Sequence, residues 1–171
     1  MPEMDDFRRE LVLASSNAGK LAELSAMLQP LGWKVSPQSK WVKEEAVENG
    51  LSFVENALIK ARHAARFSGL AALGDDSGLV VDALQGRPGI YSSRFAGENA
   101  NDQDNIQKLL CAMKGVEIPD RNAHFYCAMA LVRHAGDPAP LIATGKWPGL
   151  ILEEPRGQGG FGYDPLFWVP G

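Results

Sequence analysis

Cysteine, long apolar stretches and targeting signals are scarce or absent in this sequence. Its 171 residues include only two cysteines, Cys111 and Cys127, which form no CxxC pair. This usage argues against a zinc site and against a disulfide framework. No apolar run approaches the ~20 residues of a membrane span, and residues 1–6 lack the basic and apolar regions of a signal peptide. We therefore expect a cytoplasmic protein with no membrane partner.

Positive charge is also limited. The formal net charge is −4, and the lysines and arginines are not gathered in a block. Proteins that bind long nucleic acids normally present a basic stripe, so nucleic acid is not an expected partner. A small anionic ligand held by a few lysines is compatible with this charge distribution.

The length and composition fit one globular domain. Hydrophobic residues make up 45% and charged residues 22% of the chain, as in ordinary globular proteins. No internal repeat, linker or low-complexity segment interrupts it. We predict a polar N-terminal extension at residues 1–10, followed by a single domain at residues 11–171.

Two adjacent carboxylates form the most informative stretch. Asp75 and Asp76 follow a short apolar run and are bracketed by Gly74 and Gly78. Glycines let backbone and ligand approach closely, and Mg²⁺ prefers carboxylate oxygens together with substrate phosphates. A metal site is one interpretation, and a surface turn is the other, because Asp, Ser and Gly are common turn residues.

A second candidate site follows the first apolar run, residues 11–14. The small-residue loop 15–20 leads into a helical pattern that ends at Gly32. This order places free backbone N–H groups at a helix N-terminus, where phosphate binds, and Lys20 adds a positive charge. The loop is not a Walker A motif, because Ala14 and Leu21 stand where that motif needs Gly and Ser or Thr.

A helix is predicted after Gly50, because Ser52 and Glu55 have the spacing of a capping box. Its apolar stripe ends near Gly69. The other face carries Asn56 and Lys60, one turn apart. Lys60 is either a solvated lysine or a second phosphate contact.

The rest of the chain predicts packing elements and one unusual loop. A helix starts at Asn101, and strands are expected at 123–132, 141–147 and 166–169. Residues 157–162 include four glycines, and the loop around them holds Phe161 and Tyr163. It could bind a flat ring, or it could be a hairpin with its aromatics in the core.

Together these features favour a Mg²⁺-dependent hydrolase that acts on a nucleotide phosphate. Glu48, Asp75 and Asp76 supply carboxylates, and the lysines offset phosphate charge. A phosphoryl-transfer enzyme is a further alternative. The absence of Ser or Thr at position 21 counts against it.

Five motifs in this order and spacing resemble the inosine triphosphate pyrophosphatase family, also called RdgB/HAM1. The similarity is strongest to its bacterial dITP/XTP pyrophosphatases, and it runs from Leu11 to Gly171. The motifs are Ser15-Ser16-Asn17-Ala18-Gly19-Lys20, Phe53-Val54-Glu55-Asn56-Ala57 with Lys60-Ala61, Asp75-Asp76-Ser77-Gly78-Leu79, Pro88-Gly89-Ile90-Tyr91-Ser92 and Gly159-Gly160-Phe161-Gly162-Tyr163-Asp164-Pro165.

The resemblance implies an α/β fold with a long central mixed β-sheet flanked by helices, and two lobes with a cleft between them. It also implies a homodimer. The implied reaction is Mg²⁺-dependent hydrolysis of dITP, ITP and XTP to the monophosphate and pyrophosphate, which removes deaminated purines from the nucleotide pool.

The resemblance also implies roles for particular residues. Asp76 is the implied catalytic carboxylate and, with Glu48, a metal ligand, and Asp75 assists it. The implied substrate contacts are Ser15, Ser16, Asn17, Lys20, Lys60 and Ser77, and the nucleoside loop is Phe161, Gly162, Tyr163 and Asp164. The Phe161 ring is expected to stack on the base.

Members of that family usually continue past the segment that corresponds to Trp168-Val169-Pro170, into a helix and a Ser-His-Arg element that contacts base and phosphate. The sequence given stops at Gly171. The expected domain therefore lacks this helix and tail. The alternative function is a catalytically impaired nucleotide-binding module without the base-binding element.

Overall fold

The computed structural model describes residues 9–171. The larger part of the predicted N-terminal extension, residues 1–8, lies outside the described residues. Glu10 already belongs to the first strand. None of the helices in the described part of the chain has the length and apolar character needed to cross a membrane.

Helices and strands alternate along most of the chain. The strands are β1 (Glu10–Leu13), β2 (Lys34–Pro37), β3 (Ala71–Val81), β4 (Asn122–Val132), β5 (Leu141–Ile151) and β6 (Phe167–Trp168), and the α-helices are α1 (Ala18–Leu28), α2 (Phe53–Ser68) and α3 (Asp102–Ala112). Short 3₁₀ helices occupy Gln29–Leu31, Gln38–Lys40, Asp82–Leu84, Gly89–Arg94 and Asp164–Leu166.

The six strands form one sheet in the order β2-β1-β3-β4-β5-β6. Strand β1 pairs in parallel with β2 and β3, whereas β5 and β6 pair antiparallel. The predicted α/β class with a mixed sheet and flanking helices is confirmed. By its contacts the described chain divides into two compact units, residues 9–76 with 128–143 and residues 77–127 with 144–171.

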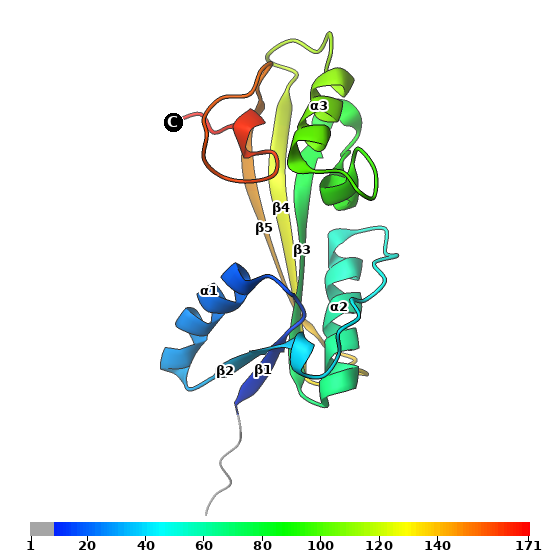
Figure 1. Cartoon of the computed structure of the whole chain (residues 1–171), viewed down its shortest axis with the longest axis vertical. Helices are drawn as coiled ribbons and strands as arrows, with labels where there is room; N and C mark the ends of the chain where they lie inside the picture. The colour runs from blue at the N-terminus through cyan, green and yellow to red at the C-terminus, as the bar shows by residue number, and fades with distance from the viewer. Residues whose placement is uncertain (1–8) are drawn as a thin grey trace, which may run out of the picture. The chain divides into compact units, whose positions relative to one another are not determined.

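The first unit has a helix on each side of its strands (Figure 1). Leu11, Leu13 and Leu73 pack on one face against the leucines of α1. On the opposite face Gly74 lies against α2, where a Cβ atom would sit 2.7 Å from Ala61 N and closer still to Ala57 O. Only glycine permits this approach, which brings α2 up to the acidic part of β3.

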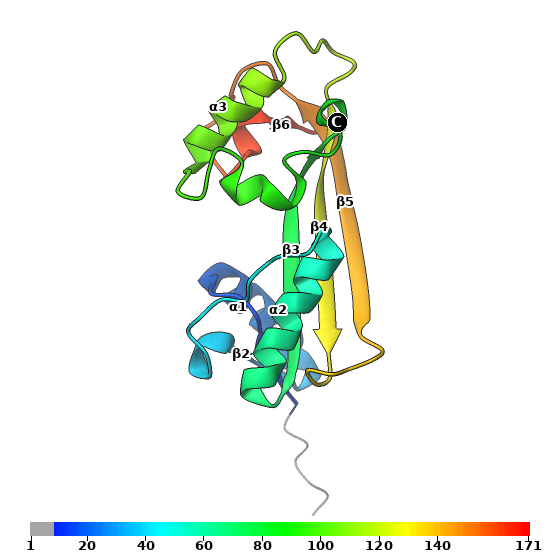
Figure 2. The ribbon, with the colours of Figure 1, turned by 90° about the vertical axis from the view of Figure 1, so that its right-hand side faces the viewer.

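The second unit is built around α3 and the C-terminal segment, which lie beside each other (Figure 2). Leu79 and Val81 of β3 pack with Leu109 of α3 and with Leu166. The helix begins at Asn101, whose side chain accepts a hydrogen bond from Asp104 N in a complete capping box. This N-cap prediction is confirmed, and so is Ser52 as the N-cap of α2.

The local structure around Asp75 and Asp76 is not the surface turn that was one of the two sequence interpretations. Neither a turn nor the end of a short strand is present, because β3 continues from Ala71 through Ser77 to Val81. The strand stops at Val81 and gives way to a 3₁₀ turn. Burial of the segment within the sheet outweighs the turn preference of its Gly, Asp and Ser residues.

Candidate active site

The two central carboxylates point to opposite faces of β3. Side chains alternate along a strand, so Asp76 lies on the face of Gly74 toward α2, and Asp75 lies on the face of Leu73 toward α1. Both residues are buried, with exposures of 7% for Asp75 and 9% for Asp76. Each therefore needs its own positively charged partner.

Asp75 pairs with the lysine of the predicted phosphate loop. Lys20 Nζ lies 2.5 Å from Asp75 Oδ2. The loop itself is ordered by Asn17, whose Oδ1 accepts from Lys20 N at 3.0 Å and caps α1, and by Ser15 Oγ, which accepts from Asn17 N. Ser16 and Asn17 are exposed. The predicted helix N-terminus with an adjacent lysine is confirmed as a structure.

Asp76 shares Lys60 with Glu48. Lys60 Nζ forms an ion pair with Glu48 Oε1 and lies 3.5 Å from Asp76 Oδ1. Burial lowers the pKa of Lys60, but Glu48 and Asp76 raise it by more, so the pKa ends above its usual value. Lys60 is therefore positively charged at neutral pH. The structure favours a half-buried, ion-paired site lysine over the solvated one.

The Asp76 carboxyl group has a raised pKa. Burial raises it, Lys60 opposes that effect, and the charge of Glu48 adds to it. Its Oδ2 atom is buried and has no hydrogen-bond partner among the described residues. An unpaired buried carboxylate oxygen is costly unless something positive or a donor reaches it.

The structure allows a direct test of whether these residues suit a divalent cation. Within residues 9–171 no three Asp, Glu, His or Cys side chains are grouped as a metal site, because Asp75 turns away from Asp76. Mg²⁺, however, commonly uses one or two carboxylates and completes its shell with waters and substrate phosphates. Glu48 and Asp76, joined through Lys60 and with Oδ2 unpaired, fit that smaller donor set.

One buried residue near these carboxylates was given no role from the sequence. Asn56 is fully buried on α2, and its Oδ1 accepts from Gly50 N at 2.8 Å. Its amide lowers the pKa of Asp76, and its Nδ2 has no hydrogen-bond partner within residues 9–171. Its position one turn before Lys60 on the same helix face was the available sequence signal.

The second unit contains a pocket of about 430 Å³. The predicted residues Ser77, Phe161, Gly162, Tyr163 and Asp164 all line it. Phe161 is 83% exposed, so its ring is accessible, as base stacking requires. The second aromatic of the loop behaves differently, because Tyr163 is buried.

Tyr163 anchors the loop. Its hydroxyl donates to Ser92 O at 2.6 Å, and burial, helped by the charge of Asp102, raises its pKa, which keeps the hydroxyl protonated. Gly162 N donates to Asp102 Oδ2 at 2.8 Å and Phe161 N donates to Asp164 Oδ2 at 3.0 Å. Asp102, like Asn105, Phe125 and Trp147, lines the pocket and was not predicted from the sequence.

Comparison with known proteins settles the family. The model of the Ham1 family matches residues 11–171. The chain belongs to the Ham1 family. A dITP/XTP pyrophosphatase from Methylococcus capsulatus is 58% identical to this Ham1 chain over 164 residues, which cover 96% of the chain and 82% of that protein.

Further relatives agree with this assignment. A dITP/XTP pyrophosphatase from Vibrio cholerae is 53% identical over 162 residues, 95% of the Ham1 chain and 81% of that protein. Among solved structures, a HAM1 protein from Coxiella burnetii has a TM-score of 0.91 and 53% sequence identity, and the match covers 94% of this chain and 82% of that one. The predicted family is confirmed.

Proposed function

We propose that this Ham1 chain is a nucleoside triphosphate pyrophosphatase that hydrolyses dITP, ITP and XTP to the monophosphate and pyrophosphate. The activity named for its relatives at 52–58% identity supports the reaction class and the substrates. The observation that carries the proposal is the Glu48-Lys60-Asp76 group, in which the buried Oδ2 of Asp76 has no hydrogen-bond partner among the described residues. Hydrolysis of these triphosphates would remove them from the nucleotide pool and keep deaminated purines out of nucleic acid.

The residues of the first unit are assigned to the triphosphate. The loop residues Ser15, Ser16 and Asn17 offer hydroxyl, amide and backbone donors at the start of α1. Lys20 and Lys60 offset phosphate charge. Substrate phosphates would compete with Asp75 and Glu48 for these lysines, since each lysine is already ion-paired.

Asp76 is assigned as the catalytic carboxylate, with Asp75 as an assisting one. A raised pKa makes Asp76 a stronger base than an ordinary aspartate, which suits the acceptance of a proton from an attacking water. Lys60, held protonated beside it, stabilises negative charge that develops on the phosphate. The lysines then offset the negative charge of the departing pyrophosphate.

Glu48 and Asp76 are the residues that would hold Mg²⁺. When bound, the cation neutralises phosphate charge and acidifies a coordinated water. In the second unit, Ser77 and the loop residues Phe161, Gly162, Tyr163 and Asp164 are assigned to the nucleoside, with the exposed Phe161 ring against the base.

The remaining assignments are part of the same proposal. Residues 11–171 act as one functional domain, the protein works as a homodimer, and it acts in the cytoplasm on free nucleotides. Sedimentation equilibrium over a hundredfold range of protein concentration tests the dimer. A monomer throughout that range, with full activity, would reject it.

A product assay tests the activity. Wild-type protein receives Mg²⁺ with dITP, XTP, dATP or dGTP separately, and we expect pyrophosphate from dITP and XTP and little from the other two. Asp76→Asn should lower kcat by about 10²- to 10⁴-fold, the usual contribution of a general base. Asp120→Asn, an exposed residue outside the assigned residues, is the control and should stay active.

Three other outcomes have distinct meanings. Thermal stabilisation by the triphosphates without any product would indicate a nucleotide-binding module. Inorganic phosphate in place of pyrophosphate would indicate a phosphoryl-transfer enzyme. Near-normal turnover by Asp76→Asn would reject Asp76 as the catalytic carboxylate.

A further inference from the structure

Two buried polar atoms without a partner occur together beside the carboxylate site. In the part of the chain that the structure describes, three buried side-chain atoms lack a hydrogen bond, and two of them are Asn56 Nδ2 and Asp76 Oδ2. One is a donor and the other an acceptor. Asn56 lies one turn before Lys60 on α2, and Lys60 Nζ lies 3.5 Å from Asp76 Oδ1, which brings Asn56 to the same part of the site. The amide of Asn56 also lowers the pKa of Asp76. A complementary pair of this kind calls for an explanation beyond packing.

The other end of the same amide fixes the loop that carries Glu48. Asn56 Oδ1 accepts from Gly50 N, two residues after Glu48. The fit is tight, because a Cβ atom at position 50 would lie 2.7 Å from Asn56 Oδ1. A single buried side chain thus connects the Glu48 loop, the Lys60 helix and the Asp76 strand.

A second buried asparagine in the chain has both ends of its amide occupied. Asn105 on α3 accepts from Ala96 N at 2.8 Å and donates from Nδ2 to Ser93 O at 3.0 Å. Both of its ends are satisfied by the protein backbone. Asn56 satisfies only its acceptor in this way, and its buried donor has no hydrogen-bond partner among residues 9–171.

We propose that Asn56 is a positioning residue of the hydrolytic site, which holds Asp76 through Nδ2 and Glu48, by way of Gly50, through Oδ1. The inference rests on the proposed function and assigns a residue that it leaves without a role. Lys60 lies on the Oδ1 side of Asp76. The amide acts on Oδ2, and because a carboxylate oxygen has two lone-pair sites, Oδ2 can accept from the amide and still face a cation. Partners that orient a metal-binding carboxylate tune its affinity for the cation.

The pairing itself is tested by stability, without any substrate. Thermal unfolding is measured for wild type, Asn56→Asp, Asp76→Asn and the reciprocal double variant that exchanges the two side chains. Asn56→Asp sets two carboxyl groups against each other, whereas the exchange restores one donor and one acceptor. We expect the double variant to unfold at a higher temperature than Asn56→Asp. Additive effects of the two substitutions would overturn the proposal.

The effect on the site is tested with a matched pair of alanine variants. Asn56→Ala removes both ends of the amide, and Glu55→Ala removes the neighbouring tie of α2 to the same loop, in which Leu51 N donates to Glu55 Oε2. Binding of Mn²⁺, followed by its electron paramagnetic resonance signal, substitutes for Mg²⁺. Asn56→Ala should weaken Mn²⁺ binding and lower kcat by about 10- to 100-fold each, the range found for such orienting partners.

The control separates positioning from loss of stability. Glu55→Ala should lower the unfolding temperature through the lost helix cap, yet leave Mn²⁺ affinity and kcat near the wild-type values. Equal losses in both variants would overturn the positioning role. Failure of wild-type protein to release pyrophosphate would reject the proposed function alone, because the stability cycle of Asn56 and Asp76 is read without turnover.

Discussion

At the residue scale, Asp76 is buried and Lys60 is half-buried, and each favours the charged form of the other. Burial raises the pKa of Asp76, and the charge of Lys60 is the strongest influence that lowers it. Asp75 has its own lysine, Lys20, on the opposite face of the strand. The two lysines are therefore not equivalent, although both are expected to contact phosphate.

This difference predicts distinct pH profiles for two otherwise similar variants. Lys60→Met removes the main influence that lowers the Asp76 pKa, so the acid limb of the kcat/KM profile should move to higher pH. Lys20→Met should lower kcat/KM through weaker phosphate binding and leave the acid limb in place. The measurement is kcat/KM for dITP between pH 5 and 9. Identical displacement in both variants would contradict the separate environments of the two aspartates.

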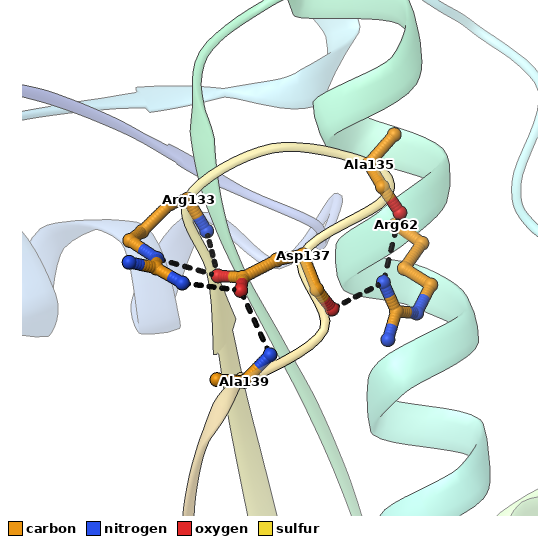
Figure 3. A network of polar contacts seen from close by, with 5 residues as sticks. All are labelled: Arg62, Arg133, Ala135, Asp137 and Ala139. Atoms are coloured by element: carbon orange, nitrogen blue, oxygen red, sulfur yellow. Dashed lines mark hydrogen bonds and ion pairs between the residues drawn. The ribbon is translucent and has the colours of Figure 1, made fainter.

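At the element scale, the turn between β4 and β5 is fastened to α2 (Figure 3). Arg62 Nη1 donates to the carbonyl oxygens of Ala135 and Asp137, at 2.8 and 3.0 Å. The Asp137 carboxylate accepts from the Arg133 side chain at 2.7 and 2.9 Å and from two backbone N–H groups. These donors hold the pKa of Asp137 far below its usual range.

The Asp137 network makes stability depend on acid in a defined direction. Because the folded-state pKa is depressed, the stabilisation is complete above the unfolded-state pKa of about 3.9, and it is lost as the pH falls through the folded-state value. Wild type should therefore unfold at a higher temperature than Asp137→Asn at pH 5–7, and the gap should close as the pH falls below 4. Thermal unfolding at each pH measures it. Asp120→Asn serves as the reference variant. A difference in unfolding temperature between wild type and Asp137→Asn that widened in acid would refute the stabilising role of the Asp137 network.

Sequence patterns predicted the elements with local signals and missed those set by tertiary contacts. The helix caps at Ser52 and Asn101 could be predicted because their hydrogen bonds join residues only three positions apart. The strand through Asp75 and Asp76 could not be predicted in this way, since its Gly and Asp residues favour turns. Burial against α2 outweighs that turn preference. The family motifs propose Asp76 and Phe161 as site residues, but the hydrogen bond from Gly162 N to Asp102 joins residues 60 positions apart and leaves no local pattern.

At the scale of the whole molecule, the assigned residues fall into two groups in two compact units, and the chain passes directly from one to the other at Asp76 and Ser77. The phosphate residues belong to the first unit and the nucleoside residues to the second. The phosphate part and the nucleoside part of the substrate should therefore bind separate segments of the chain. This expectation can be tested with fragments of the nucleotide.

Amide hydrogen exchange reports which segment each fragment protects. Pyrophosphate with Mg²⁺ should slow exchange within residues 15–20 and leave residues 157–164 unchanged, and deoxyinosine should do the reverse. A non-hydrolysable dITP analogue with Mg²⁺ should protect both segments. At 100 times its Kd it should add about 2.7 kcal/mol of stability, which raises the unfolding temperature by about 5–10 °C for a domain of this size. Omission of Mg²⁺ should remove most of that rise, because the phosphate charges near Glu48 and Asp76 are then not neutralised. Protection of residues 157–164 by pyrophosphate alone would show that the loop binds phosphate, and the assignment of the two groups would have to be reversed.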